Sequence, residues 1–166
     1  MSFRIAVLSD THMTTPSSAL LKAFDSHLQH TDALLHCGDV TGEEVWAFLN
    51  SHACFVSVAG NMDMGSWTDD LPGETSLRIR GIKVGLLHGH GLGFGRLAHK
   101  VAEVFEPDVD LICFGHTHRR EWVQDPSGTR ILNPGSFSLP KKGPPGYAVV
   151  QVDDDLNLRA EWIDLM

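Results

Sequence analysis

Blocks of apolar residues alternate with polar segments over the first sixty positions and predict strands and helices in turn. Residues 3–8 are apolar apart from Arg4, as is typical of a buried strand. The segment that follows Pro16 carries apolar residues at helical spacing and predicts an amphipathic helix that extends to about Leu28. Strands at 33–36 and 54–59 on either side of a helix at 43–50 repeat the alternation.

Strands predominate in the remainder of the chain. We expect a hairpin whose strands flank Gly81-Ile82, and a helix at about 96–105. Further strands are predicted at 111–114, 129–132, 147–152 and 156–163. Strand–helix units combined with hairpins indicate an α/β fold of two packed mixed sheets with helices outside. No linker or repeat interrupts the pattern, so one domain spanning 1–166 is expected.

Composition narrows the setting of the protein. The chain has 166 residues, of which 42% are apolar, enough for one domain with its own core. No run approaches the roughly 20 apolar residues of a membrane span, and the start lacks a signal-peptide pattern. We therefore expect a cytoplasmic protein without a membrane segment. The formal charge of −8 argues against an extended nucleic-acid surface.

Five apolar runs end in side chains that can bind metal ions. Taken alone, an Asp, Asn or His after a strand is usually a turn or cap residue, but five such ends are hard to explain by capping. Three of them carry a glycine directly before the polar residue, where the backbone turns sharply or approaches another segment. The side chains delivered are Asp10 and His12, Asp39, Asn61, His88, and the pair His116 and His118.

The residue types in this set indicate the class of metal. Carboxylate, imidazole and amide ligands together suit Mn, Fe, Ni, Co or Zn better than calcium, and we favour Mn. Seven groups are too many for one tetrahedral zinc and fit two ions that share a carboxylate. The sequence therefore predicts two divalent metal ions per chain.

The order of these short motifs resembles that of the calcineurin-like metallophosphoesterases, in particular their small prokaryotic phosphodiesterases. The motifs, which span residues 9–136, are D-x-H, G-D, G-N-x-D, H-G-H, G-H-x-H and N-P-G-S. Each is weak alone, whereas the ordered set is specific. The resemblance implies a four-layer α-β-β-α sandwich, in agreement with the elements predicted above.

The resemblance also implies a distribution of ligands between the two ions. One ion would be bound by Asp10, His12, Asp39 and His118, and the other by Asp39, Asn61, His88 and His116, so that Asp39 bridges. Such a pair activates a bridging water as hydroxide and stabilises charge on a phosphoryl group. The implied activity is hydrolysis of a small phosphoester, with Asn61 also contacting the substrate.

One position departs from the family pattern. Many relatives carry a histidine after the G-N pair that assists the leaving group as a general acid, but Met62 stands there and cannot donate a proton. Diesters are therefore favoured over monoesters as substrates. His90 is the candidate substitute for the acid, while Asp63 is expected to orient a ligand or loop. The glycine-rich segment 91–96 suggests a lid beside the site, from which Arg96 reaches substrate phosphate.

Other functions are compatible with parts of this pattern. The eukaryotic retromer scaffold subunit resembles this fold and binds partners without catalysis, although that type tends to have degraded ligand positions and all seven are intact here. A phosphomonoesterase is a further alternative. A hydrolase of the metallo-β-lactamase type is disfavoured because its H-x-H-x-D-H motif is absent. Association into a homo-oligomer is left open.

Overall fold

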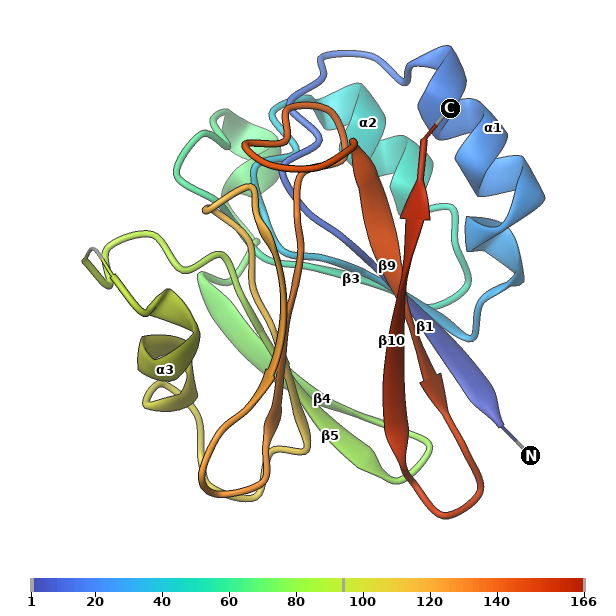
Figure 1. The fold of residues 1–166 in the computed structure, drawn as a ribbon. Coiled ribbons are helices and arrows are strands. Elements are labelled where there is room, and N and C mark those ends of the chain that lie inside the picture. The colour runs from blue at the N-terminus through green and yellow to red at the C-terminus, as the bar shows by residue number, and fades with distance from the viewer. Residues whose placement is uncertain (1, 94, 166) are drawn as a thin grey trace.

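The computed structural model describes residues 2–93 and 95–165, which form two five-stranded sheets packed face to face (Figure 1). Helices α1 (Ser18–Ser26) and α2 (Glu43–Leu49) cover the outer face of one sheet. Helix α3 (Leu97–Ala102) packs on the outer face of the other sheet. The predicted four-layer α-β-β-α sandwich is therefore confirmed.

The first sheet has the order β10-β9-β1-β2-β3. Its strands β1, β2 and β3 are parallel, while β9 runs antiparallel to β1 and β10 runs antiparallel to β9. The carboxyl ends of the three parallel strands therefore lie side by side at the same end of the sheet, as their register shows. The bounds are β1 (Phe3–Leu8), β2 (Ala33–His36), β3 (Phe55–Ser57), β9 (Gly146–Val152) and β10 (Leu158–Asp164).

The second sheet has the order β4-β5-β6-β8-β7. Strands β5, β6 and β8 are parallel, and the antiparallel strands β4 and β7 form the two edges. Both sheets are thus mixed, as predicted. The bounds are β4 (Glu74–Ile79), β5 (Ile82–Leu87), β6 (Leu111–Cys113), β7 (Arg120–Gln124) and β8 (Arg130–Pro134).

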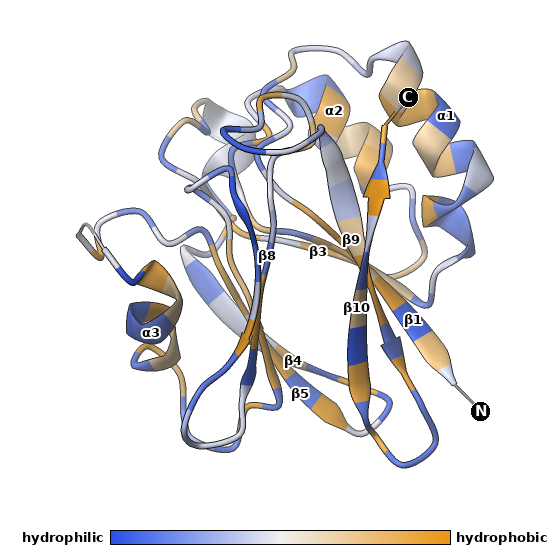
Figure 2. Ribbon diagram, in the orientation of Figure 1, coloured by the Kyte–Doolittle hydropathy of each residue, from blue (hydrophilic) through white to orange (hydrophobic). Residues whose placement is uncertain are grey.

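The central strands are apolar on both faces because each sheet is covered on both sides. In β1, Ile5 and Val7 pack against the other sheet, whereas Ala6 and Leu8 pack beneath α1 and α2. Figure 2 shows apolar segments along the strands and mixed apolar and polar colouring on the helices. Each fully buried Val or Leu contributes about 1.5–3 kcal/mol relative to an exposed one. This packing fixes the strand ends from which the polar loops start.

The helices are shorter than their hydrophobic patterns predict. The hydroxyl of Ser17 accepts a hydrogen bond from Leu20 N at 3.2 Å and so caps α1, which starts at Ser18, and a 3₁₀ turn, η1 (Leu28–His30), follows it. Helix α3 begins only after Arg96, whose φ is +40°. A second 3₁₀ turn, η2 (Ser66–Thr68), interrupts the loop before β4.

Two further details differ from the sequence-based expectation. The hairpin turns at Arg80-Gly81, where both residues have positive φ, rather than at Gly81-Ile82. Strand β7 was not predicted, because its residues do not alternate cleanly between apolar and polar types. Within the described ranges, no helix has the length and apolar composition that crossing a membrane requires.

Candidate metal centre

The loops that follow the parallel strands bring aspartates and histidines from both sheets together. Asp10 follows β1 and Asp39 follows β2, while His88 follows β5 and His118 lies in the loop after β6. Asp10 and His88 are fully buried, and Asp39 is 3% exposed. Carboxylates at this depth require a compensating positive charge or several hydrogen bonds.

The ligand atoms form two overlapping groups. The first contains Asp10, His12 and His118, the second contains Asp10, Asp39 and His88, and within each group the atoms lie within 4.8 Å of one another. In the first, Asp10 Oδ1 is 3.1 Å from His118 Nε2 and 3.6 Å from His12 Nε2. In the second, Asp39 Oδ2 is 3.3 Å from His88 Nε2. These are the spacings expected of atoms that converge on a cation.

Asp39 also reaches the first group. Its Oδ2 atom lies 3.6 Å from His12 Nε2 as well as 3.3 Å from His88 Nε2. One carboxylate oxygen is thus close to a histidine of each group. This position is compatible with a carboxylate that bridges two ions.

Backbone carbonyl groups set the tautomers of two of the histidines. His88 Nδ1 is 2.7 Å from the carbonyl oxygen of Cys37, and His118 Nδ1 is 2.6 Å from that of Leu139. A carbonyl only accepts, so Nδ1 must carry the hydrogen in both rings. In the neutral rings, Nε2 then points a lone pair at the centre, which is the usual arrangement of metal-binding histidines.

Several polar atoms at the centre lack hydrogen-bond partners in the part of the chain that the structure describes. Asp10 Oδ1 and His88 Nε2 are buried and have no such partner. The Nε2 atoms of His12 and His118 lie 3.3 Å apart, although neutral His118 offers only a lone pair there. Unpartnered buried acceptors are costly, and a cation between them removes the cost. The residues therefore fit a divalent metal ion.

Electrostatics favour the ionised carboxylates. Burial acts to raise the pKa of Asp10, but its contacts with His118 and His12 outweigh burial and hold this pKa well below its usual range. Burial likewise opposes ionisation of Asp39, whose pKa is nevertheless lowered by its contact with His88. Contact with Asp10 raises the pKa of His118, and contact with Asp39 raises that of His88 despite burial. Both carboxylates are thus charged and available as ligands.

The backbone of these loops is strained at the candidate ligands themselves. Of the described residues other than glycine, nine have positive φ, and five of them belong to the predicted ligand set. Such conformations cost of order 1–3 kcal/mol and persist where surrounding contacts impose them, often at functional sites. The five are Asp10, His12, Asp39, His116 and His118, with φ between +45° and +67°.

The glycines that precede three of the predicted ligands allow close approach. A Cβ atom on Gly60 would lie 2.1 Å from Asp39 Oδ1, and one on Gly115 would lie 1.9 Å from the hydroxyl oxygen of Ser9. A Cβ atom on Gly38, whose φ is +93°, would lie 2.8 Å from Gly60 N. The prediction that the backbone turns or approaches closely here is confirmed.

Asp63 acts on the loops rather than on the centre directly. Its carboxylate accepts hydrogen bonds from the backbone N–H groups of Asp39 at 2.9 Å, Gly60 at 2.8 Å and Thr41 at 2.8 Å. It therefore holds the loop after β2 against the loop after β3. This agrees with the orienting role expected for Asp63.

The remaining predicted site residues lie at the exposed rim. Asn61 is exposed and stands between Gly60 and Met62, whose N–H donates to Asp39 Oδ1 at 2.8 Å. His116 is exposed, with its ring centroid 5.2 Å from that of His88, and the ring of His90 is 5.5 Å from the same residue. His116 and His90 thus lie beside His88 without belonging to either ligand group.

Three supporting side chains had no predicted role. The hydroxyl of Ser9 donates to Asp10 Oδ2 at 2.6 Å, and the hydroxyl of Ser136 donates to the carbonyl of Asp10 at 2.8 Å. The amide of Asn133 donates to the carbonyl of Gly115 at 2.9 Å. The N-P-G-S motif, in which Asn133 and Ser136 stand, was the signal in the sequence for the last two contacts.

A cavity of about 710 Å³ opens beside the centre. It is lined by His116 and Thr117, by the glycine-rich segment with Arg96 at its end, and by Arg119, Glu121 and Lys141. The glycine-rich segment is the predicted lid, and Phe94 within it lies outside the described residues. Arg96 thus lies on the same cavity as His116, a candidate ligand.

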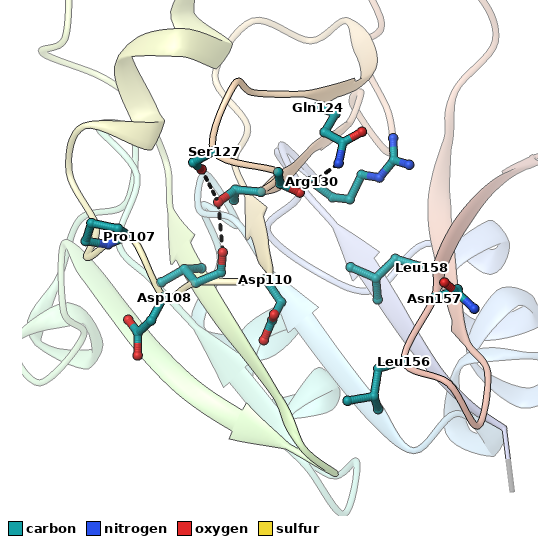
Figure 3. A pocket seen from close by; sticks show the side chains of 12 residues that line it. Pro107, Asp108, Asp110, Gln124, Ser127, Arg130, Leu156, Asn157 and Leu158 are labelled. Carbon is teal, nitrogen blue, oxygen red and sulfur yellow. Dashed lines mark hydrogen bonds between the residues drawn. The ribbon is translucent and has the colours of Figure 1, made fainter.

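A second cavity, of about 380 Å³, lies where strands β6 and β8 begin (Figure 3). Its lining includes Asp110, which directly precedes β6, and Arg130, which begins β8. The candidate ligands follow the other ends of the parallel strands. The second cavity therefore contains none of them.

Comparison with known proteins agrees with the site. The sequence pattern of the calcineurin-like phosphoesterase superfamily domain matches residues 3–155. A probable metallophosphoesterase of Methanocaldococcus jannaschii is 34% identical over 157 residues, which cover 93% of this chain and 79% of the relative.

Solved structures share the fold at lower identity. A predicted phosphoesterase from Streptococcus pneumoniae superimposes with a TM-score of 0.78 at 22% identity, covering 100% of this chain and 94% of the other. Vacuolar protein sorting 29 from Cryptosporidium parvum gives a TM-score of 0.75 at 20% identity, covering 98% of each chain. The fold and the matched domain together show that the chain belongs to the calcineurin-like phosphoesterase superfamily.

Proposed function

We propose that the chain, as one domain, is a binuclear metal-dependent phosphodiesterase. The observation that carries the proposal is the convergence of Asp10 Oδ1, Asp39 Oδ2 and the Nε2 atoms of three histidines, of which His88 is buried and two are partly buried. Among the described residues, Asp10 Oδ1 and His88 Nε2 have no hydrogen-bond partner. Mn²⁺ is the favoured ion because carboxylate and imidazole ligands are mixed.

The proposed ligands divide between two positions. Asp10, His12 and His118 would bind one ion, and His88, Asn61 and His116 the other, with Asp39 shared. The distances of 3.6 and 3.3 Å from Asp39 Oδ2 to His12 and His88 support the sharing. Asn61 and His116 are exposed, so they would complete the second position from its open side.

Two bound ions would supply an activated water and stabilise negative charge on the phosphoryl oxygens. The chain itself supplies the fixed geometry. Carbonyl groups hold the rings of His88 and His118, and Asp63 holds the loop that carries Asp39. Preorganised groups of this kind need no rearrangement when charge develops on the substrate.

The proposed preference for diesters rests on how the leaving group receives a proton. Met62 is 48% exposed at the rim, where its thioether has no proton to give. His90 is the candidate acid, because its ring lies 5.5 Å from that of His88 and 6.5 Å from that of His116. We propose that leaving groups of low basicity, as in aryl diesters, are expelled most readily.

Metal stoichiometry and turnover on one preparation test the proposal. Protein reconstituted with Mn²⁺ should bind two ions per chain and hydrolyse bis(4-nitrophenyl) phosphate. Asp39→Ala should lose turnover and weaken both ions, whereas the matched change Asp70→Ala, at an exposed carboxylate, should leave both properties intact. A single bound ion, or equal turnover in Asp39→Ala, would contradict the binuclear assignment.

A further inference from the structure

The cavity beside the candidate metal centre carries an unusual concentration of positive charge. Arg96, Arg119 and Lys141 line it together with one carboxylate, Glu121. The chain as a whole has a formal charge of −8, with 13 Lys and Arg against 21 Asp and Glu. A cationic cavity on an acidic protein attracts an anion.

In the part of the chain that the structure describes, none of the three cations forms an ion pair within 4.0 Å. Across residues 2–93 and 95–165, the ion pairs within 4.0 Å involve other cations, such as Lys83 with Asp108 and Arg80 with Asp32. Arg119 acts electrostatically on Glu121, but one carboxylate cannot neutralise three cations. The positive charge therefore remains available to a ligand.

The main chain fixes two of the cations close to the centre. Lys141 N donates to the carbonyl of His118 at 3.1 Å, and Arg119 N donates to the hydroxyl oxygen of Thr117 at 3.3 Å. Arg119 and Lys141 thus start from backbone positions adjacent to the His116–His118 loop. An anion held by them would lie next to a phosphoryl group bound at the metal centre.

The size and walls of the cavity leave room for an organic group. Its volume of about 710 Å³ is within the roughly 300–1,000 Å³ typical of small-molecule sites. Gly89, Gly91, Gly93 and Gly95 form part of the lining, and a Cβ atom at Gly91 or Gly95 would have no neighbour within 4 Å. At Gly91 and Gly95 the wall presents backbone.

We propose that this cavity is a subsite for a second oxyanion on the substrate, held by Arg119 and Lys141 while the scissile phosphodiester lies at the metal centre. The inference rests on the proposed phosphodiesterase function and narrows its substrate class. The preferred substrates are diesters in which one ester group carries a further phosphate-like or carboxylate group. Arginine suits either anion because its guanidinium can donate two parallel hydrogen bonds.

Matched substrates isolate the second anion. The wild type loaded with Mn²⁺ is assayed on 4-nitrophenyl ethyl phosphate and on its 2-sulfoethyl and 2-carboxyethyl counterparts, which share one leaving group. Sulfonate is a tetrahedral anion and a poor metal ligand, so a gain with it reports on the cations. We expect kcat/KM to rise roughly tenfold with the sulfonate, as charge-assisted hydrogen bonds allow. A higher kcat/KM for the sulfonate alone would mean that the subsite prefers a phosphate-like group. A higher kcat/KM for both the sulfonate and the carboxylate would mean that it accepts any oxyanion.

The variants assign the gain to this cavity. Arg119→Gln and Lys141→Gln should each reduce the sulfonate preference several-fold and leave kcat/KM for the ethyl ester nearly unchanged. Lys142→Gln is the matched control, since Lys142 is the exposed neighbour of Lys141 and does not line the cavity. Equal loss in all three variants, or no sulfonate preference in the wild type, would overturn the subsite.

A binding measurement separates failure of the subsite from failure of the proposed function. Affinities of the Mn²⁺-loaded protein for ethylphosphonate and 2-phosphonoethanesulfonate are compared by calorimetry, without turnover. A sulfonate gain that Arg119→Gln removes supports the subsite even if no ester is hydrolysed, in which case the proposed function fails. Hydrolysis of the ethyl ester with no sulfonate gain in either assay retains the proposed function and overturns the subsite.

Discussion

Gly60→Ala is a one-carbon perturbation aimed at Asp39. The added Cβ would lie 2.1 Å from Asp39 Oδ1, 2.3 Å from Asp39 N and 2.9 Å from Asp39 Cγ. Gly60 is not in the left-handed region, so the effect is steric and not a matter of backbone φ. Its own N–H is bonded to Asp63, which prevents the loop from moving away freely.

The size of the effect follows from these contacts. The 2.1 Å contact must lengthen to at least 3.4 Å, where ordinary van der Waals contact begins. Overpacking in such confined positions costs about 1–3 kcal/mol of stability. Displacement of a positioned group by roughly 1 Å can cost about 10²-fold in rate. We therefore expect a modest loss of stability and a much larger loss of Mn²⁺ affinity and turnover.

Urea denaturation, Mn²⁺ titration and hydrolysis of bis(4-nitrophenyl) phosphate measure the three quantities. Gly73→Ala is the control, because a Cβ there meets nothing within 4 Å and its φ is not positive. A tolerated Gly→Ala change stabilises by about 0.4–1 kcal/mol through the unfolded chain, so the control should have the opposite sign in stability. If Gly60→Ala bound Mn²⁺ and turned over like Gly73→Ala, Asp39 would not be essential to the centre.

Three further predictions concern the loops, the protons and the leaving group. Asp63→Ala leaves three backbone N–H groups without their acceptor. It should lower the free energy of unfolding, measured in urea, by about 2–4 kcal/mol and should weaken Mn²⁺ binding. An unchanged Mn²⁺ affinity would show that the loops keep their shape without Asp63. The pKa values of His88 and His118 are raised above 6.5, so protons compete with the ion for these two rings. The affinity for Mn²⁺ should therefore rise from pH 6 until both rings are neutral. An affinity that calorimetry shows to be constant from pH 6 to 9 would contradict their role as ligands. Met62→His should narrow the rate gap between aryl and alkyl diesters, and a loss in His90→Ala confined to alkyl diesters would instead identify His90 as the existing acid.

The ends of the strands were predictable because apolar runs and the polar residues after them are local in sequence. Burial on both sides of the sheets explains why runs such as residues 5–8 are continuously apolar, and parallel strands place their ends together. The convergence of Asp10 and His118 follows from that topology. The missed strand β7 contains Arg120, Glu121 and Trp122, whose half-buried positions give no clear period of two.

Other features depend on contacts that no local pattern encodes. The cationic cavity joins Arg119 to Lys141, which are distant in sequence and become neighbours only through the path of the loop after β8. Positive φ is uncommon for any residue other than glycine, and at Asp10 and His116 it is held by tertiary contacts, such as the bond from His116 N to Asp10 Oδ2 at 3.1 Å. The end of each strand was predictable from the sequence, whereas the direction in which the side chain of the following residue points was not.

The pairing of His12 with His118, 106 positions apart in the chain, has a consequence for folding kinetics. The two residues follow strands of different sheets, so a productive ion site exists only after both sheets have formed and docked. Such long-range closure is characteristic of slow-folding topologies. Ion binding would then stabilise the native state with little effect on the folding transition state. Removal of the ion by a chelator should therefore act mainly by accelerating unfolding, because the bound ion would slow the separation of the two sheets.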